Sequence, residues 1–356
     1  MDWEAGILAA PMPYAPHHLG SSVLRLRILR SGCVAAALVL LLVIPAQAEE
    51  PGLRPARLIA VARMRLGDGS GAEIVSVQHK TARAVVALPA YGHVAVIDLR
   101  NAHRPRWIAR HDLRLRRHEA ITSIAFHPTE NAYLVTVESV RPRSRGRVHV
   151  HDASTGRRIG THAVGVGPDA IMINPQGTFA VVANEAEEYV FNRARMGFES
   201  PEGGVSILDL RSGLTQIRAR TLTLRDQSRK PGTPTPEDKR VLVRAVDLDG
   251  DAQLTKQERE VALTLDNHGP GNLEPESVAF SPDGTRCYVT LQENNMLLTL
   301  DPARARILSL RGLGVTEHPA DVTNDGKVAF DATLRAFREP DGVAVTPDGK
   351  YVVTAD

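Results

Sequence analysis

The sequence predicts an all-β protein built from one repeated strand–turn–strand unit. Three observations carry this prediction: the same phrase recurs along the chain, its strands alternate apolar and polar residues, and copies begin at Val75, Ile121 and Pro168. Alternation with a period of two is typical of a strand with one buried face. Units of three or four short strands that repeat at about 40–45 residues are the pattern of β-propeller blades. We therefore expect a β-propeller.

The repeated unit is a pair of strands joined by a tight turn. A turn such as Pro282-Asp283-Gly284 favours reversal, because Pro fixes φ and Gly accepts a positive φ. A β-sandwich with coincidental turns is the alternative, and repetition of one phrase argues against it. The clear copies lie at 121–137, 168–183, 275–291 and 340–355, a weaker copy lies at 75–89, and third strands ending in an acidic residue are expected at 93–99, 147–153, 204–210 and 296–302.

The N-terminal 48 residues have the features of an export signal. Arg25, Arg27 and Arg30 precede an apolar run at 33–45, and Ala46-Gln47-Ala48 supplies the small residues of a cleavage site. The run is shorter than the ~20 residues that span a bilayer, so the pattern favours a cleaved signal over a membrane anchor. We expect a mature propeller domain at 49–356 in the periplasm or outside the cell, with no transmembrane span.

Composition restricts the partners. The chain has 43 Lys+Arg against 41 Asp+Glu, a formal net charge of +2, so no nucleic-acid partner is expected. Hydrophobic residues make up 43% of the 356, enough for a sizeable core. Once the signal is removed a single cysteine, Cys287, remains, and no intramolecular disulfide can form.

An insertion at 222–272 interrupts the repeat and carries the sharpest chemical motif. Its stretch DLDGDAQLTKQE at 247–258 places oxygen-bearing residues at the spacing of an EF-hand loop, between two expected helices. Ala252 stands where such loops have Gly, which costs ~1 kcal/mol if the position is left-handed. A solvated acidic turn is the alternative, and the pattern favours Ca²⁺. The expected ligands are Asp247, Asp249, Asp251, Gln253, Thr255 and Glu258.

A second acidic loop, DVTNDGKVAFD at 321–331, resembles a calcium loop less completely. Its closing acid falls one position early, so an Asx-rich turn is the favoured interpretation and a metal site the alternative. The residues concerned are Asp321, Thr323, Asp325 and Asp331.

Acids also recur at equivalent positions of the repeat. The first strand of every propeller blade lines the central channel, so equivalent positions converge on one mouth. A ring of carboxylates there could bind a cation or a basic ligand, or serve acid–base chemistry. Caps on turns are an equally weighted alternative. The expected channel-mouth acids are Glu138, Asp169, Glu185, Glu276, Glu293 and Asp341.

No nucleophile or metalloprotease motif accompanies these acids. The sequence lacks G-x-S-x-G, H-E-x-x-H and a P-loop. His149 and His151 share one face of a strand, and two ligands do not make a metal site, so we expect them on the surface of a sheet.

Several phrases resemble a known family. GPDAIMINPQGTFAVVANEAE at 167–187, ESPEGGVSILDL at 199–210, LEPESVAFSPDGTRCYVTLQENN at 273–295 and EPDGVAVTPDGKYVVTAD at 339–356 are similar to the bacterial choice-of-anchor I proteins. These are exported β-propellers of the YVTN type, related to a mesenchyme-specific cell-surface glycoprotein. The resemblance implies an exported or surface-attached propeller, seven-bladed in the full family, with no defined biochemical activity. Some members carry phosphatase-like labels, but no phosphatase motif is present here.

These observations leave two functional hypotheses. The first is a binding or scaffold propeller that holds Ca²⁺ and recognises an unknown protein or surface ligand; the second is a propeller hydrolase acting on phosphate or other esters through the channel-mouth carboxylates and a metal. The pattern favours the non-catalytic hypothesis. Outside the signal and insertion the chain suffices for five to six blades at about 45 residues each. The last copy stops within its second strand at 351–356, so a C-terminally truncated propeller with a missing portion is expected.

Overall fold

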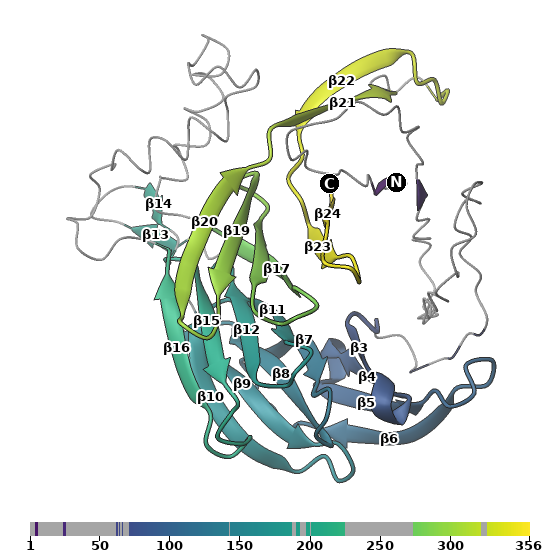
Figure 1. Cartoon of the computed structure of the whole chain (residues 1–356), viewed down its shortest axis with the longest axis vertical. Helices are drawn as coiled ribbons and strands as arrows, with labels where there is room; N and C mark the ends of the chain where they lie inside the picture. The colour runs from purple at the N-terminus through teal and green to yellow at the C-terminus, as the bar shows by residue number, and fades with distance from the viewer. Residues whose placement is uncertain are drawn as a thin grey trace.

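The described residues form an arc of antiparallel β-sheets arranged around a centre (Figure 1). The computed structural model describes residues 71–141, 143–186, 190–192, 197–199, 201–224, 273–321 and 326–356, together with 4–5, 24–25, 62, 64 and 66. In this part of the chain, four-stranded sheets follow one another in sequence order, and two two-stranded sheets come after them. The repeated sheets confirm the all-β, propeller-like prediction.

Each four-stranded sheet is one blade, with its strands in chain order from the inside of the arc to the outside (Figure 1). Blade 1 contains β3 (Val75–Gln78), β4 (Arg83–Leu88), β5 (His93–Asp98) and β6 (Arg106–Asp112). Blade 2 contains β7 (Glu119–Phe126), β8 (Ala132–Ser139), β9 (Arg145–Asp152) and β10 (Arg158–Val166).

The next two blades repeat this order. Blade 3 contains β11 (Pro168–Ile173), β12 (Phe179–Asn184), β15 (Gly204–Asp209) and β16 (Arg218–Thr223). Blade 4 contains β17 (Pro275–Phe280), β18 (Cys287–Leu291), β19 (Met296–Asp301) and β20 (Arg306–Gly312). The last sheet pairs β23 (Gly342–Val345) with β24 (Val352–Ala355).

The remaining elements are short connections and hairpins. The single-turn 3₁₀ helices η1 (His79–Thr81) and η2 (Pro89–Tyr91) join strands of blade 1. Three further pairs are antiparallel: β1 (Glu4–Ala5) with β2 (Leu24–Arg25), β13 (Val190–Asn192) with β14 (Gly197–Glu199), and β21 (Val315–Ala320) with β22 (Ala332–Phe337). In the described part of the chain no helix is long and apolar enough to cross a bilayer. The expected helical insertion at 222–272 falls almost wholly outside the described residues, apart from 222–224 in and just after β16.

The two ends of a blade differ in what they carry. We call the end where each first strand begins the upper end; Pro168 and Pro275 lie there, paired with the last residues of the second strands. The opposite end is the lower end. There the first and second strands are joined by turns whose glycines, Gly177 and Gly284, have positive φ of 69° and 66°. The third and fourth strands are also joined at the lower end, since Asp209 pairs with Phe179 and with Arg218.

The apolar core lies between neighbouring blades. Strands of blades 1 and 2 enclose one cluster that includes Val96, Phe126 and Val135, while blades 2 and 3 and blades 3 and 4 enclose two more. Many of these side chains are completely buried, and burying one Val or Leu contributes roughly 1.5–3 kcal/mol. Stacking of blades against each other is therefore what stabilises the arc.

The seam between blades 1 and 2 also contains histidines, which corrects the expectation that His149 and His151 lie on a sheet surface. His149 is 2% exposed and His151 1% exposed, and both share the face of Tyr133. The rings of Tyr133 and His151 are stacked with centroids 5.4 Å apart, and His111 Nδ1 lies 2.9 Å from the Tyr133 hydroxyl. Blade stacking buries this strand face, and that information is absent from the local sequence.

Candidate functional site

The predicted channel-mouth acids come together at the upper end of the inner strands. Asp169 lies at the start of β11 and Glu276 at the start of β17, and Asp341 directly precedes β23. Contacts between these inner strands run from β7 to β11, then to β17 and β23. The repeat thus brings one carboxyl from each of three successive sheets to the same place.

Burial and mutual repulsion perturb this group. The pKa of Asp169 rises to about 6, first because burial penalises the charged form and then because Asp341 and Glu138 repel it. The pKa of Glu276 rises to about 9, again through burial first, followed by the charge of Asp341 and a hydrogen bond to it; Glu185 and Asp169 add to the effect. Five of the six expected acids therefore interact directly.

Glu276 is the protonated member of the group at neutral pH. Its carboxyl is hydrogen-bonded to Asp341, whose nearby charge disfavours ionisation of Glu276. Gln292, with its amide NH₂ turned toward Glu276, donates to both carboxyl oxygens at 3.0 and 2.7 Å. Gln292 occupies the blade-4 position that corresponds to Glu185 in blade 3, one residue after the end of the second strand.

The alternative that these acids cap turns does not hold for Asp169 and Glu276. Within the described residues, no backbone N–H donates to either carboxyl. Other aspartates do cap turns, at both ends of the blades: Asp283 Oδ1 accepts from Thr285 N at 3.1 Å at the lower end, and Asp112 Oδ1 accepts from Arg114 N at 2.8 Å at the upper end. The sixth expected acid, Glu293, is not among the charges that perturb Asp169 or Glu276; it repels Glu339, whose pKa is raised by burial and by that repulsion.

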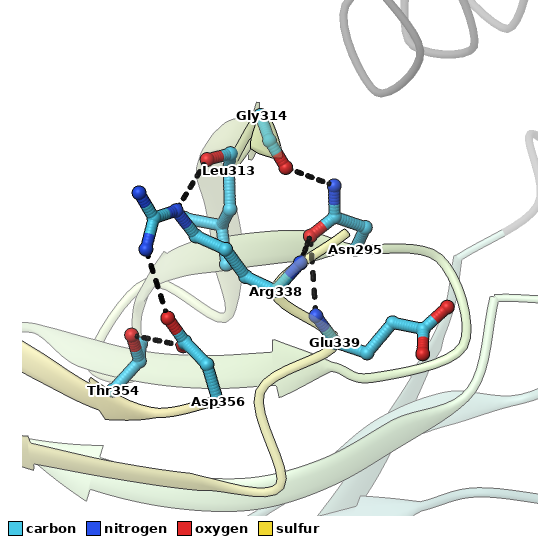
Figure 2. A network of polar contacts seen from close by, with 7 residues as sticks. All are labelled: Asn295, Leu313, Gly314, Arg338, Glu339, Thr354 and Asp356. Atoms are coloured by element: carbon cyan, nitrogen blue, oxygen red, sulfur yellow. Dashed lines mark hydrogen bonds and ion pairs between the residues drawn. The ribbon is translucent and has the colours of Figure 1, made fainter. Parts of the chain in front are cut away.

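Asn295 fixes the segment that carries Asp341, as Figure 2 shows. This asparagine is 1% exposed and follows the second strand of blade 4. Its Nδ2 donates to the Gly314 carbonyl at 2.7 Å, and its Oδ1 accepts from the backbone N–H groups of Arg338 and Glu339 at 3.2 and 3.3 Å. One side chain therefore connects both ends of the β21–β22 hairpin to blade 4.

The Arg338 side chain extends this network to the β23–β24 sheet. Its Nε donates to the Leu313 carbonyl at 3.1 Å, and its guanidinium forms an ion pair with Asp356 at 3.0 Å (Figure 2). Arg338 and Asp356 are only 16% and 11% exposed, so this pair is better shielded from water than the ion pairs of the blade turns. The sequence patterns do not predict the roles of Asn295 and Arg338; the run of polar residues at 292–295, between two apolar strands, is the signal that could indicate them.

The predicted calcium ligands Asp247, Asp249, Asp251, Gln253, Thr255 and Glu258 lie outside the described residues, as do Thr323 and Asp325 of the second loop, so both loops stay predictions. At the edges of the second loop, Asp321 Oδ2 accepts from the Ala329 backbone N–H at 3.2 Å, and Asp331 is exposed. In the described part of the chain, no three His, Cys, Asp or Glu side chains are placed to hold a metal ion.

The acid group can therefore do two things chemically. Its ionised members attract a cationic ligand, and Glu276 beside Asp341 is a proton donor paired with an acceptor. Cys287 supplies no nucleophile to it, because this thiol is free but completely buried and its pKa is raised by burial.

Comparison with known proteins identifies the kind of propeller. A choice-of-anchor I domain model matches residues 73–356. The chain belongs to the choice-of-anchor I family. The matched region of this choice-of-anchor I protein includes every blade and the acid group at the upper end. Comparison with curated protein sequences gives no match.

Solved structures with similar architecture are distant in sequence from the choice-of-anchor I chain. A chain of Kuenenia stuttgartiensis hydrazine synthase has 13% identity and a TM-score of 0.48, covering 82% of this chain and 70% of its own. A chain of a nidogen/laminin complex has 12% identity and a TM-score of 0.41, with 81% and 72% covered. A functionally unknown protein from Desulfotomaculum acetoxidans DSM 771 has 13% identity and a TM-score of 0.45, with 82% and 65% covered.

Proposed function

We propose that this choice-of-anchor I chain is an exported or cell-surface propeller that acts as a binding or scaffold module. The observation that carries the proposal is the gathering of equivalent carboxyls, one sheet after another, at the upper end of the inner strands. A repeated surface of this kind recognises a ligand through several weak, equivalent contacts. The family match is consistent with a surface role, and no nucleophile motif accompanies the carboxyls.

The proposal includes a calcium ion in the insertion. Asp247, Asp249, Asp251 and Glu258 recur at EF-hand spacing, with Gln253 and Thr255 completing the ligand set. Four acids so close in sequence repel one another unless a cation binds them. Calcium would then order the insertion, which begins at the end of β16.

Thermal unfolding in the presence and absence of Ca²⁺ tests this part. We expect Ca²⁺ at millimolar concentration to raise the Tm of the wild-type protein by several degrees, since binding to the native state stabilises it by mass action. Asp247→Ala should abolish the rise. Asp226→Ala, which removes an acid of the same insertion outside the loop, is the matched control and should retain it. An unchanged wild-type Tm would reject the calcium site.

A hydrolase remains the second candidate because of one specific observation. Glu276, with a pKa of about 9 beside Asp341, is a proton donor of the kind that general acid catalysis uses. Hydrolysis of a panel of phosphate and carboxylate esters, measured with and without divalent metals, tests this candidate. Wild-type activity that is lost in both Glu185→Gln and Glu276→Gln would favour the hydrolase. An inactive wild type would reject the hydrolase in favour of the binding module.

A further inference from the structure

A second repeated charge pattern lies at the lower end of the blades, where each third strand ends in an aspartate. The carboxylate accepts the backbone N–H of the turn that follows, for example Arg100 N to Asp98 Oδ1 at 2.9 Å. It also binds the guanidinium of a turn arginine. The three ion pairs are Arg100–Asp98 at 2.6 Å, Arg211–Asp209 at 2.6 Å and Arg304–Asp301 at 2.7 Å.

A second arginine begins the fourth strand of each of these blades, directly opposite the aspartate. Arg106 pairs in register with Asp98, Arg218 with Asp209, and Arg306 with Asp301. All three are exposed, and within the described residues no hydrogen bond or ion pair engages their guanidinium groups. The turn arginine already binds the carboxylate, so the strand arginine keeps all its donors for another partner. Blade 2 departs from this pattern, because Arg158 begins its fourth strand but pairs in register with His151 instead of Asp152, with one long contact to His149 at 3.5 Å.

These arginines occupy one rim of the molecule. The fourth strands β6, β10, β16 and β20 are the outermost strands of their blades and lie along the convex side of the arc (Figure 1). Their first residues all lie at the lower end, opposite the acid group of the upper end. The chain is nearly neutral overall, and these arginines form a repeated pattern at the lower end. Apolar side chains accompany the arginines, since Trp107 and Ile108 of β6 are 41% and 45% exposed and Ile307 and Leu308 of β20 are each 39% exposed.

The distribution of charge restricts what can bind. Nearer the axis, the lower-end turns expose Glu130, Asp283 and Asp348, which would repel a flat anionic membrane pressed against the whole face. Duplex DNA is too stiff to follow a rim that curves over one small domain, because its persistence length is about 150 bp. A flexible polymer can track the rim and place one anionic group at each blade. Sugar rings also stack on exposed apolar side chains such as Trp107.

We propose that the rim formed by Arg106, Arg218 and Arg306 binds a flexible anionic polysaccharide. This inference rests on the proposed surface-binding function and gives it a partner class. Guanidinium groups bind sulfate and carboxylate through paired N–H donors, and recurrence of the same arginine in blades 1, 3 and 4 suits a repeating polymer.

Binding of a heparin oligosaccharide, measured calorimetrically at several salt concentrations, tests the rim. The triple variant R106Q/R218Q/R306Q should lose about tenfold or more in affinity, because each exposed charged contact contributes a modest amount and three are removed. It should also show a shallower salt dependence. The matched control R116Q/R117Q/R311Q removes the same charge from exposed arginines at the upper end and should stay within about twofold of wild type.

Each other outcome contradicts the proposal. Equal losses in the two triple variants would mean that heparin responds only to net charge, and no binding by wild type would exclude the polymer. Binding to phosphatidylglycerol vesicles without heparin binding would assign the rim to a membrane instead. The single variants Arg218→Gln and Arg306→Gln replace the triple if it fails to fold. The Ca²⁺-dependent rise in Tm, measured on the same proteins, should persist in the rim variants. This measurement therefore distinguishes an incorrect polysaccharide proposal from an incorrect calcium proposal.

Discussion

At the scale of single residues, the position of a carboxyl in the blade determines its chemistry. Asp98 at the lower end binds Arg100, and the side-chain hydrogen bond to that arginine lowers the pKa of the carboxyl to about 2. Glu276 at the upper end meets other carboxyls in a half-buried place, and its pKa rises to about 9. The same functional group is therefore a fixed charge at one end of the blade and a proton carrier at the other.

Glu276 should make the protein less stable as the pH rises. Its folded-state pKa lies above its unfolded value of about 4.5, so the folded state binds the extra proton. Its contribution to the free energy of unfolding is fully present below pH 4.5 and is lost as the pH rises toward 9. Glu276→Gln keeps the hydrogen-bonding shape without an ionisable group and should be more stable than wild type by about 1–2 kcal/mol at pH 9, after allowance for solvent screening.

Urea unfolding at pH 4, 7 and 9 measures this effect. Wild type and Glu276→Gln should agree at pH 4 and diverge as the pH rises. Glu130→Gln, an exposed glutamate at the lower end, is the control and should follow wild type throughout. Parallel pH profiles for wild type and Glu276→Gln would show that Glu276 is ionised in the folded protein.

At the scale of elements, the sequence predicts the inner strands well and the outer strands poorly. The first three strands of each blade alternate or run apolar because blade stacking buries them. Their expected positions agree with β3–β5, with β7–β9, with β11, β12 and β15, and with β17–β19. The fourth strands are mostly exposed on both faces; β6, for instance, reads RWIARHD with one buried residue. Without a buried face a strand leaves no periodic signal, so only its pairing in the structure reveals it.

The candidate site likewise has a part that the sequence predicts and a part that it does not. Convergence of Asp169, Glu276 and Asp341 is predictable, because equivalent positions of a radial repeat must meet. The hydrogen bonds of Asn295 are not predictable, because they join blade 4 to residues 43 and 44 positions later. Such contacts depend on the path of the β21–β22 hairpin, which the repeat does not contain.

At the scale of the whole molecule, stability at low pH depends on a different region from stability at high pH. The carboxyls lie where blades 3 and 4 meet the β23–β24 sheet, whereas the histidines lie between blades 1 and 2. The pKa of His149 is lowered to about 4, first by burial and then by the charges of Arg158, His151 and Arg147, while Glu119 opposes them. Two separate seams therefore respond to pH with opposite signs.

His149 should make the protein less stable in acid. Its folded pKa lies below the unfolded value of 6.5, so its contribution is present above pH 6.5 and is lost as the pH falls toward 4. His149→Leu retains the volume of the side chain but cannot take a proton. Between pH 7 and pH 4 its free energy of unfolding should therefore fall by about 2 kcal/mol less than that of wild type. His103→Leu, at an exposed histidine of blade 1, is the control and should lose as much stability in acid as wild type does.

Hydrogen exchange at pH 4.5 locates the effect, because wild type should lose protection first in β8 and β9, while blade 4 remains protected. Uniform loss of protection in all blades would contradict a local seam and would mean that the arc unfolds in acid as one unit.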